Sequence, residues 1–117
     1  MTLIQSEQVA IRLVIEDQLK AFQANDSYAA FALVAPKIQQ KFKTADNFLH
    51  LIKTDYAPLY RPSSVVFEGL TFFQNTPTQL VMFLSQRAEL FRAMYLMEKQ
   101  KAGRWLIQDF FLFAVDE

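Results

Sequence analysis

Four polar side chains of this sequence lie among mostly apolar neighbours, namely Gln18, Gln79, Tyr95 and Asp109. Three of them share the odd-numbered side of consecutive expected strands, where residues two apart point to the same face of a sheet. If the turn between the first two strands is centred near Arg87, Gln79 lies opposite Tyr95. Asp109 then lies beside Tyr95 or beside the residue two positions before it. Gln18, on the apolar stripe of the first helix, is expected to face this surface.

A carboxylate inside an apolar cavity has a raised pKa and can serve as a general acid or base. We therefore take Asp109 and Tyr95 as the candidate catalytic pair of a cofactor-free lyase or isomerase, and all four side chains as candidate ligand contacts. Two structural interpretations explain the same pattern without any catalytic or ligand-binding role. The polar groups can hydrogen-bond one another or the backbone, as buried polar groups generally do. Asp109 can also lie at a water-filled rim.

A further group of candidates lies in the segment Tyr56–Pro62, which contains two prolines. Each proline disfavours helix in the residue before it, so we expect a loop or an extended passage here. Tyr56, Tyr60 and Arg61 can form a rim over a cavity mouth, where a guanidinium group suits a carboxylate ligand. Alternatively, the two tyrosines are packed anchors of the loop, with their hydroxyl groups in water.

Several classes of site and partner do not fit the composition. There is no cysteine and a single histidine, His50, which falls on the outer side of its expected helix, so we expect no metal site and no cofactor. Lys+Arg and Asp+Glu both number 12, which lacks the basic excess of a nucleic-acid surface. No apolar run is long enough to cross a membrane, and no secretory signal opens the chain, so a cytoplasmic protein is expected.

The elements that must position these residues are helices first and strands second. We expect one domain over residues 1–117, with helices at about 6–54 and a sheet at about 64–113. The expected strands cover residues 64–73, 79–84, 90–99 and 104–113, and their short connections favour an antiparallel meander. The apolar alternation slips by one residue at Gly69, which indicates a β-bulge and a bent sheet. This is the α+β pattern, in which N-terminal helices pack on a strongly bent four-stranded sheet.

The even-numbered side of the strands is apolar as well, apart from Arg92 and Gln108. An exposed face of this kind exceeds the apolar patches usual on monomers, so we expect a homodimer that buries it. The expected interface residues are Leu80, Met82, Met94, Leu96, Phe110 and Leu112. The alternatives are that a helix end or the C-terminal tail covers this face, or that another protein does.

Short segments in a fixed order give the chain a family resemblance. They are residues 14–22, 30–36, 56–62, 93–98 and 103–107, together with Phe48 and Gln79. On these segments the chain resembles the nuclear-transport-factor-2-like superfamily, also called cystatin-like or SnoaL-like, and more narrowly an uncharacterised bacterial family of domains of unknown function. The resemblance implies a cone-shaped fold and frequent dimers, and no activity. The family usually has a glycine where this chain has Ala88 and Glu89.

These observations lead to two functional hypotheses. The first is a small cone-fold protein that binds a small apolar ligand in the cone, or that serves a structural or interaction role as a homodimer. The alternative is the lyase or isomerase that uses Asp109 and Tyr95.

Overall fold

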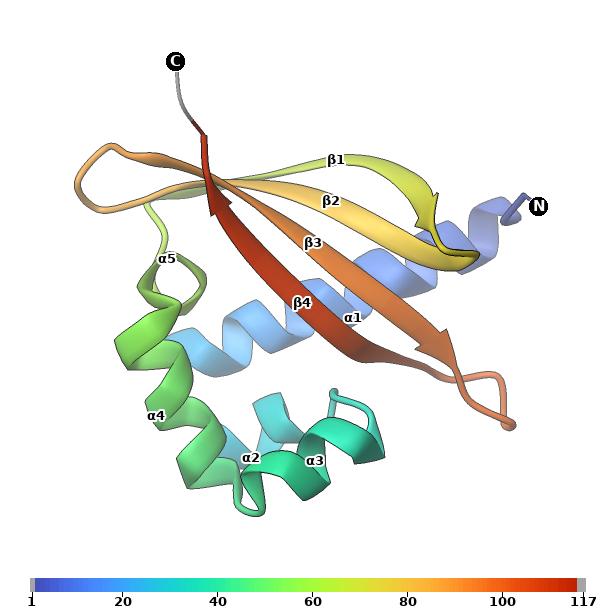
Figure 1. The fold of residues 1–117 in the computed structure, drawn as a ribbon, viewed down its shortest axis with the longest axis horizontal. Helices are drawn as coiled ribbons and strands as arrows, with labels where there is room; N and C mark the ends of the chain where they lie inside the picture. Colours follow the sequence, from blue (N-terminus) through green and yellow to red (C-terminus); the bar gives the residue numbers. More distant parts are fainter. Residues whose placement is uncertain (1, 116–117) are drawn as a thin grey trace.

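A computed structural model describes residues 2–115, and within them five helices precede four strands (Figure 1). The helices are α1 (Gln5–Gln23), α2 (Ser27–Phe31), α3 (Pro36–Phe42), α4 (Ala45–Asp55) and α5 (Ala57–Tyr60). The strands are β1 (Ser64–Phe73), β2 (Thr76–Leu84), β3 (Leu90–Lys99) and β4 (Trp105–Ala114). The predicted α+β order is therefore confirmed.

Two segments differ from the sequence-based prediction by more than one residue. The segment expected to be a loop contains the single helical turn α5, because Pro58 falls in the first turn, where a proline removes no helical hydrogen bond. β2 begins at Thr76, three residues earlier than predicted. Gln74 and Asn75 both adopt positive φ angles, of 50° and 65°, and form a two-residue hairpin turn. Because this turn is so short, β2 starts directly after it.

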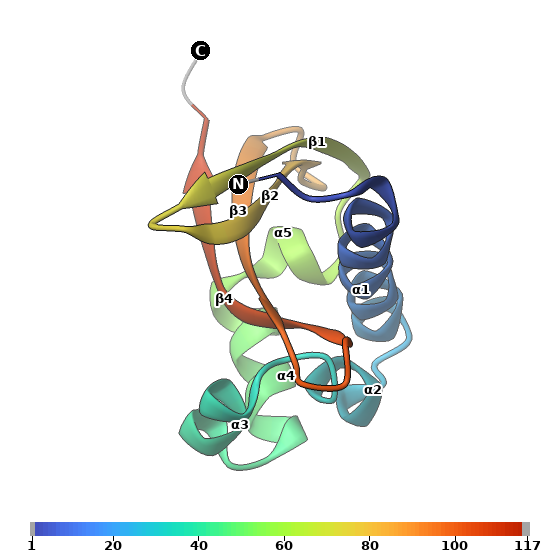
Figure 2. The ribbon, with the colours of Figure 1, turned by 90° about the vertical axis from the view of Figure 1, so that its right-hand side faces the viewer.

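α1 is the long helix that lies under the sheet. Its predicted apolar stripe is confirmed, because Ile11, Ile15, Leu19 and Phe22 are all buried. The sheet has the order β1-β2-β3-β4, and all neighbours are antiparallel, as predicted. Figures 1 and 2 show a curved sheet with the helices gathered on one side of it. We call the side towards the helices the inner face and the other side the outer face.

A β-bulge interrupts the pairing of β1 with β2. The register shifts between Phe67 and Leu70, so Glu68 and Gly69 together oppose the single residue Leu80, and the bulge predicted at Gly69 is confirmed. Residues on either side of it, Phe67 and Leu70, both pack against the core. The bulge thus keeps the apolar residues of β1 on the inner face and adds to the bend of the sheet.

A second bulge lies in β4 and was not predicted. Leu96 pairs with Asp109 and Met97 pairs with Ile107, so Gln108 is the extra residue. A one-residue shift reverses the face of every side chain that follows. Phe110 and Leu112, predicted for the outer face, therefore lie on the inner face, where Phe110 is buried and Leu112 packs against the core. The prediction for these two interface residues is wrong for this reason.

Aromatic rings fill the space between the sheet and the helices at the β4 side. The ring of Phe48 in α4 lies 5.5 to 6.4 Å, centroid to centroid, from those of Phe22, Phe31, Phe42 and Phe110. The chain between α2 and α3 also pairs with the edge of β4, where Ala35 N–H donates to Ile107 C=O at 2.8 Å.

In residues 2–115, no helix combines the length and the apolar character needed to cross a bilayer.

Candidate functional site

Tyr95 lies at the centre of the inner face of β3 and is fully buried. As predicted, it is paired with Gln79 of β2, and its other neighbour, on β4, is Phe110. Its hydroxyl group has no hydrogen-bond partner among the described residues. Burial in apolar surroundings raises the pKa of the Tyr95 phenol, since the charged form loses its hydration. Tyr95 therefore stays neutral at physiological pH.

Asp109 lies on the outer face, opposite Leu96, and is exposed. Its carboxylate accepts a hydrogen bond from the N–H of Phe110 at 2.8 Å. The predicted acid–base pair is therefore wrong, because Asp109 and Tyr95 leave opposite faces of the sheet. The physical reason is the bulge at Gln108, which turns the carboxylate to water and avoids the cost of burying a charge.

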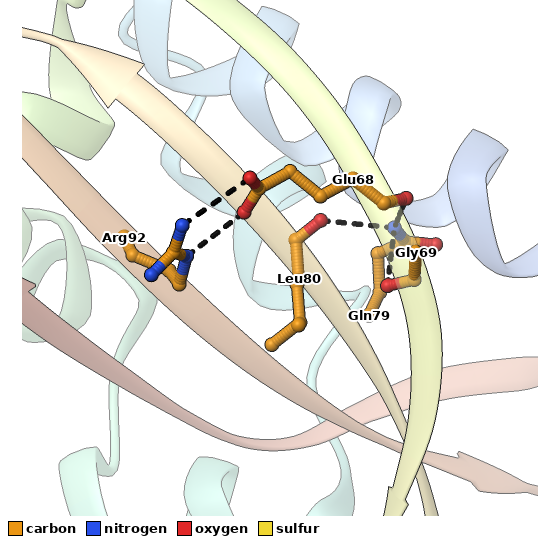
Figure 3. A network of polar contacts seen from close by, with 5 residues as sticks. All are labelled: Glu68, Gly69, Gln79, Leu80 and Arg92. Atoms are coloured by element: carbon orange, nitrogen blue, oxygen red, sulfur yellow. Dashed lines mark hydrogen bonds and ion pairs between the residues drawn. The ribbon is translucent and has the colours of Figure 1, made fainter.

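The two glutamines are buried, but each of them bonds to the backbone. Gln18 donates from its side-chain amide to the C=O of Ala30 at 3.2 Å, which ties α1 to α2. Gln79 donates to the C=O of Glu68 at 2.9 Å and to the C=O of Leu80 at 3.0 Å (Figure 3). The predicted convergence of four polar side chains is therefore wrong, and Gln18 and Gln79 are instead buried amides whose side chains bond to the backbone.

The residues around the two prolines fasten α5 to the end of α1. The ring of Tyr56 packs edge-on against Phe110, with centroids 5.0 Å apart. The hydroxyl of Tyr60 donates to the side chain of Asn25. The guanidinium of Arg61 lies 4.9 Å from the Tyr60 ring centroid and donates to the C=O of Gln23 at 3.3 Å. These contacts make both tyrosines packed anchors of this segment.

Two hollows open at the surface beside these elements. The first lies between α5 and the β2–β3 turn and has a volume of about 330 Å³. The second lies between the start of α1 and the bulge of β1, has a volume of about 280 Å³, and is lined in part by Gln79. Neither is lined by Tyr95 or Gln18. The inner face at Tyr95 is instead packed against buried side chains of the core cluster, which also contains Ile15, Phe48 and Phe110.

The outer face carries mostly apolar side chains, and none of the five described helices lies on it (Figures 1 and 2). By register one of its apolar members, Leu106, is buried, and the others are half-buried or exposed: Val66, Phe73, Leu80, Met82, Leu84, Leu90, Met94, Leu96, Phe111 and Phe113. Val66, Phe113, Phe73 and Phe111 are the most open, at 58%, 51%, 45% and 43% exposure. Sequence reasoning missed Phe111 and Phe113, because residues 110–113 are all apolar and show no alternation. The residue that could have indicated the correct face is Asp109, because a charged carboxylate favours the solvent-exposed side of a sheet.

One ion pair crosses the outer face. Arg92 of β3 contacts Glu68 of β1 at 2.9 Å and 3.3 Å, so that its guanidinium reaches both carboxylate oxygens over the intervening strand β2 (Figure 3). The hydrogen bond from Arg92 lowers the pKa of the Glu68 carboxyl group. A two-point contact of this kind fixes the geometry of both side chains. The charge on this part of the face is therefore already paired within one chain.

A family model described as "Domain of unknown function (DUF4864)" matches residues 4–116. No curated protein and no solved structure matches the chain.

Proposed function

The chain belongs to this family of domains of unknown function, and we propose that it is an interaction domain that forms a homodimer through the outer face of its sheet. The observation that carries the proposal is the uncovered outer face, with its apolar residues from all four strands. Monomeric proteins rarely leave a contiguous apolar patch of more than a few hundred Å² in water. Burial against a second copy removes this surface from water.

The size of the face suits a dimer interface. Each strand has nine or ten residues. With strands about 4.8 Å apart and a rise of about 3.3 Å per residue, four such strands span a flat area of about 600 Å². Protruding side chains add to this area. A standard interface buries about 800 Å² on each partner, so the sheet face supplies a large part of the area of such a contact.

The charges of the face favour a second copy of the same chain. Glu68 and Arg92 neutralise each other, so the apolar half of the face has no free charge that would need an oppositely charged partner. Asp109 and Glu98 lie together towards the other end of the face, with threonines beside them. We therefore centre the contact on Met82 and Met94, which leaves the acidic end in water. A two-fold axis then brings identical apolar residues together.

The resemblance to the nuclear-transport-factor-2-like superfamily supports this proposal, because it implies a cone-shaped fold with frequent dimers. The bent sheet and the long underlying helix support the proposal that the chain belongs to that superfamily. The inner face argues for the interaction role over a ligand in the cone. Buried side chains pack against Tyr95 there, and the two hollows described above open elsewhere.

Light scattering coupled to size-exclusion chromatography tests the proposal directly. The chain has a mass of 13.6 kDa, and we expect a particle of twice that mass at micromolar concentration. Met94→Lys and Val66→Lys each place a charge on the outer face and should give monomers. Val9→Lys is the matched control, since Val9 lies on α1 with 51% exposure, close to the 58% of Val66. A wild-type monomer, or a dimer that Met94→Lys leaves intact, contradicts the proposal.

Disulfide trapping gives a second readout that locates the axis. The chain has no cysteine, so a single introduced cysteine can pair only with its copy in a second chain. Met94→Cys should form an intermolecular disulfide on mild oxidation, because residues near a two-fold axis approach their own copies. Thr71→Cys at the polar end of the face and Val9→Cys on α1 should stay reduced. Equal trapping at all three positions contradicts the placement.

A further inference from the structure

The geometry points to a ligand site in the hollow between α5 and the β2–β3 turn, which we propose binds an organic carboxylate with a short apolar body. The hollow is lined chiefly by Pro58, Arg61, Ser85, Arg87, Glu89 and Phe91. This site is separate from the outer face, and its occupation does not depend on the proposed homodimer.

Part of the lining of the hollow is apolar. Ala57 and Pro58 of α5 form one wall, and Phe91, on the inner face of β3, forms another. Its volume of about 330 Å³ falls within the range of small-molecule pockets, which is roughly 300–1,000 Å³. Phe91 is only partly buried, so its ring offers contact area to a short alkyl or aryl group.

The rim of the hollow is positive. Arg61 comes from the end of α5 and Arg87 from the β2–β3 turn. Among the described residues neither guanidinium takes part in an ion pair, and the contacts that hold Arg61 are the neutral Tyr60 ring and the C=O of Gln23. Glu89 is the one carboxylate among the lining residues, so the side chains around the hollow carry one net positive charge. A guanidinium group matches a carboxylate with two parallel hydrogen bonds, and this geometry selects the anionic group of the ligand.

The walls of the hollow are held in place before any ligand arrives. The hydroxyl oxygen of Ser85 accepts hydrogen bonds from the N–H groups of Arg87 and Glu89, at 3.2 Å and 3.1 Å. The side-chain amide of Gln86 donates to the C=O of Arg61 at 3.1 Å, which ties the turn to the segment after α5. A site that is already formed loses little entropy when it binds, so even a small ligand can gain affinity there.

Titration of ¹⁵N-labelled protein with sodium octanoate tests the site, with octanol as the neutral probe of similar length. We expect octanoate to shift the amide resonances of residues 57–61 and 85–91, and to bind at least about tenfold more tightly than octanol. Arg87→Gln removes one rim charge from an exposed turn, and we expect it to weaken octanoate binding about five- to tenfold. Lys101→Gln, in the exposed β3–β4 turn, is the matched control and should bind octanoate as the wild type does.

Glu89→Gln supplies a test in the opposite direction. It removes the negative charge from the rim, so octanoate should bind more tightly, whereas a variant that merely disturbed the turn would bind less tightly. The proposal is overturned if millimolar octanoate shifts no resonance of the hollow, if octanol binds equally well, or if Arg87→Gln and Lys101→Gln have the same affinity.

Discussion

Phe110 is the cross-strand neighbour of Tyr95, and the centroids of their rings lie 6.4 Å apart inside the core. The position beside the buried phenol is thus taken by an apolar ring, while the carboxylate of Asp109 lies on the opposite face of the sheet. This arrangement removes the basis for an acid–base pair at Tyr95 and makes the centre of the inner face a packed core.

Replacement of Asp109 and of Phe110 by alanine should have very different effects. Asp109 is exposed, so Asp109→Ala should change the free energy of unfolding by no more than about 0.5 kcal/mol. Phe110 is buried against Phe48, Tyr56 and Tyr95, so Phe110→Ala should lower it by about 3–5 kcal/mol. Urea denaturation of both variants gives the comparison. A large loss in Asp109→Ala would show that β4 is in the other register.

The unpartnered hydroxyl of Tyr95 should be dispensable for stability. A buried polar group without a partner costs about 1–3 kcal/mol of desolvation, so Tyr95→Phe should leave the free energy of unfolding unchanged or raise it by about 1 kcal/mol. Because burial raises its pKa, the Tyr95 phenol should ionise only when the protein unfolds, which an ultraviolet titration detects. Destabilisation by Tyr95→Phe would mean that the hydroxyl group makes a hydrogen bond.

The bulge of β1 should depend on Gln79 more than on Gly69. A Cβ atom at Gly69 would meet no atom within 4 Å, and φ at Gly69 is not positive, so Gly69→Ala should be tolerated. Gln79→Ala removes the donor to the C=O groups of Glu68 and Leu80, and we expect a loss of about 1–3 kcal/mol. Thermal unfolding of the two variants ranks them. If Gly69→Ala were the more destabilising of the two variants, the bulge would depend on the conformational freedom of the glycine.

The β2–β3 and β3–β4 turns allow two opposite substitutions, one that introduces a glycine and one that removes a glycine. Ala88 and Gly103 each occupy the third position of a three-residue connection, with φ of 62° and 91°. A side chain is disfavoured at such angles by about 1–2 kcal/mol, so Ala88→Gly should stabilise the fold by about 1 kcal/mol. Gly103→Ala should destabilise it by a similar amount. Equal and same-signed shifts in the midpoint of thermal unfolding would show that the positive φ angles do not set the stability of these turns.

The regular elements were predictable because each has a local signal. The three- and four-residue steps of Ile11, Ile15, Leu19 and Phe22 predicted the buried stripe of α1, and the slip at Gly69 predicted the first bulge. Opposed strands with a short turn also predicted the pairing of Gln79 with Tyr95. The turn α5 was missed because its four residues are too few for a helical period to show.

The sequence by itself determined the α+β order, the antiparallel meander and the apolar character of both faces of the sheet, since periodicity and turn residues act over short distances along the chain. Only the tertiary structure decided which face each residue of β4 occupies. Residues 110–113 are apolar throughout, so either register buries apolar side chains, and the bulge at Gln108 settles the choice by turning Asp109 to water and packing Phe110 against Tyr95. The hollow beside Arg61 and Arg87 was equally a tertiary result, because it joins two turns that lie 26 positions apart in the chain, Arg61 to Arg87, and no local pattern links them.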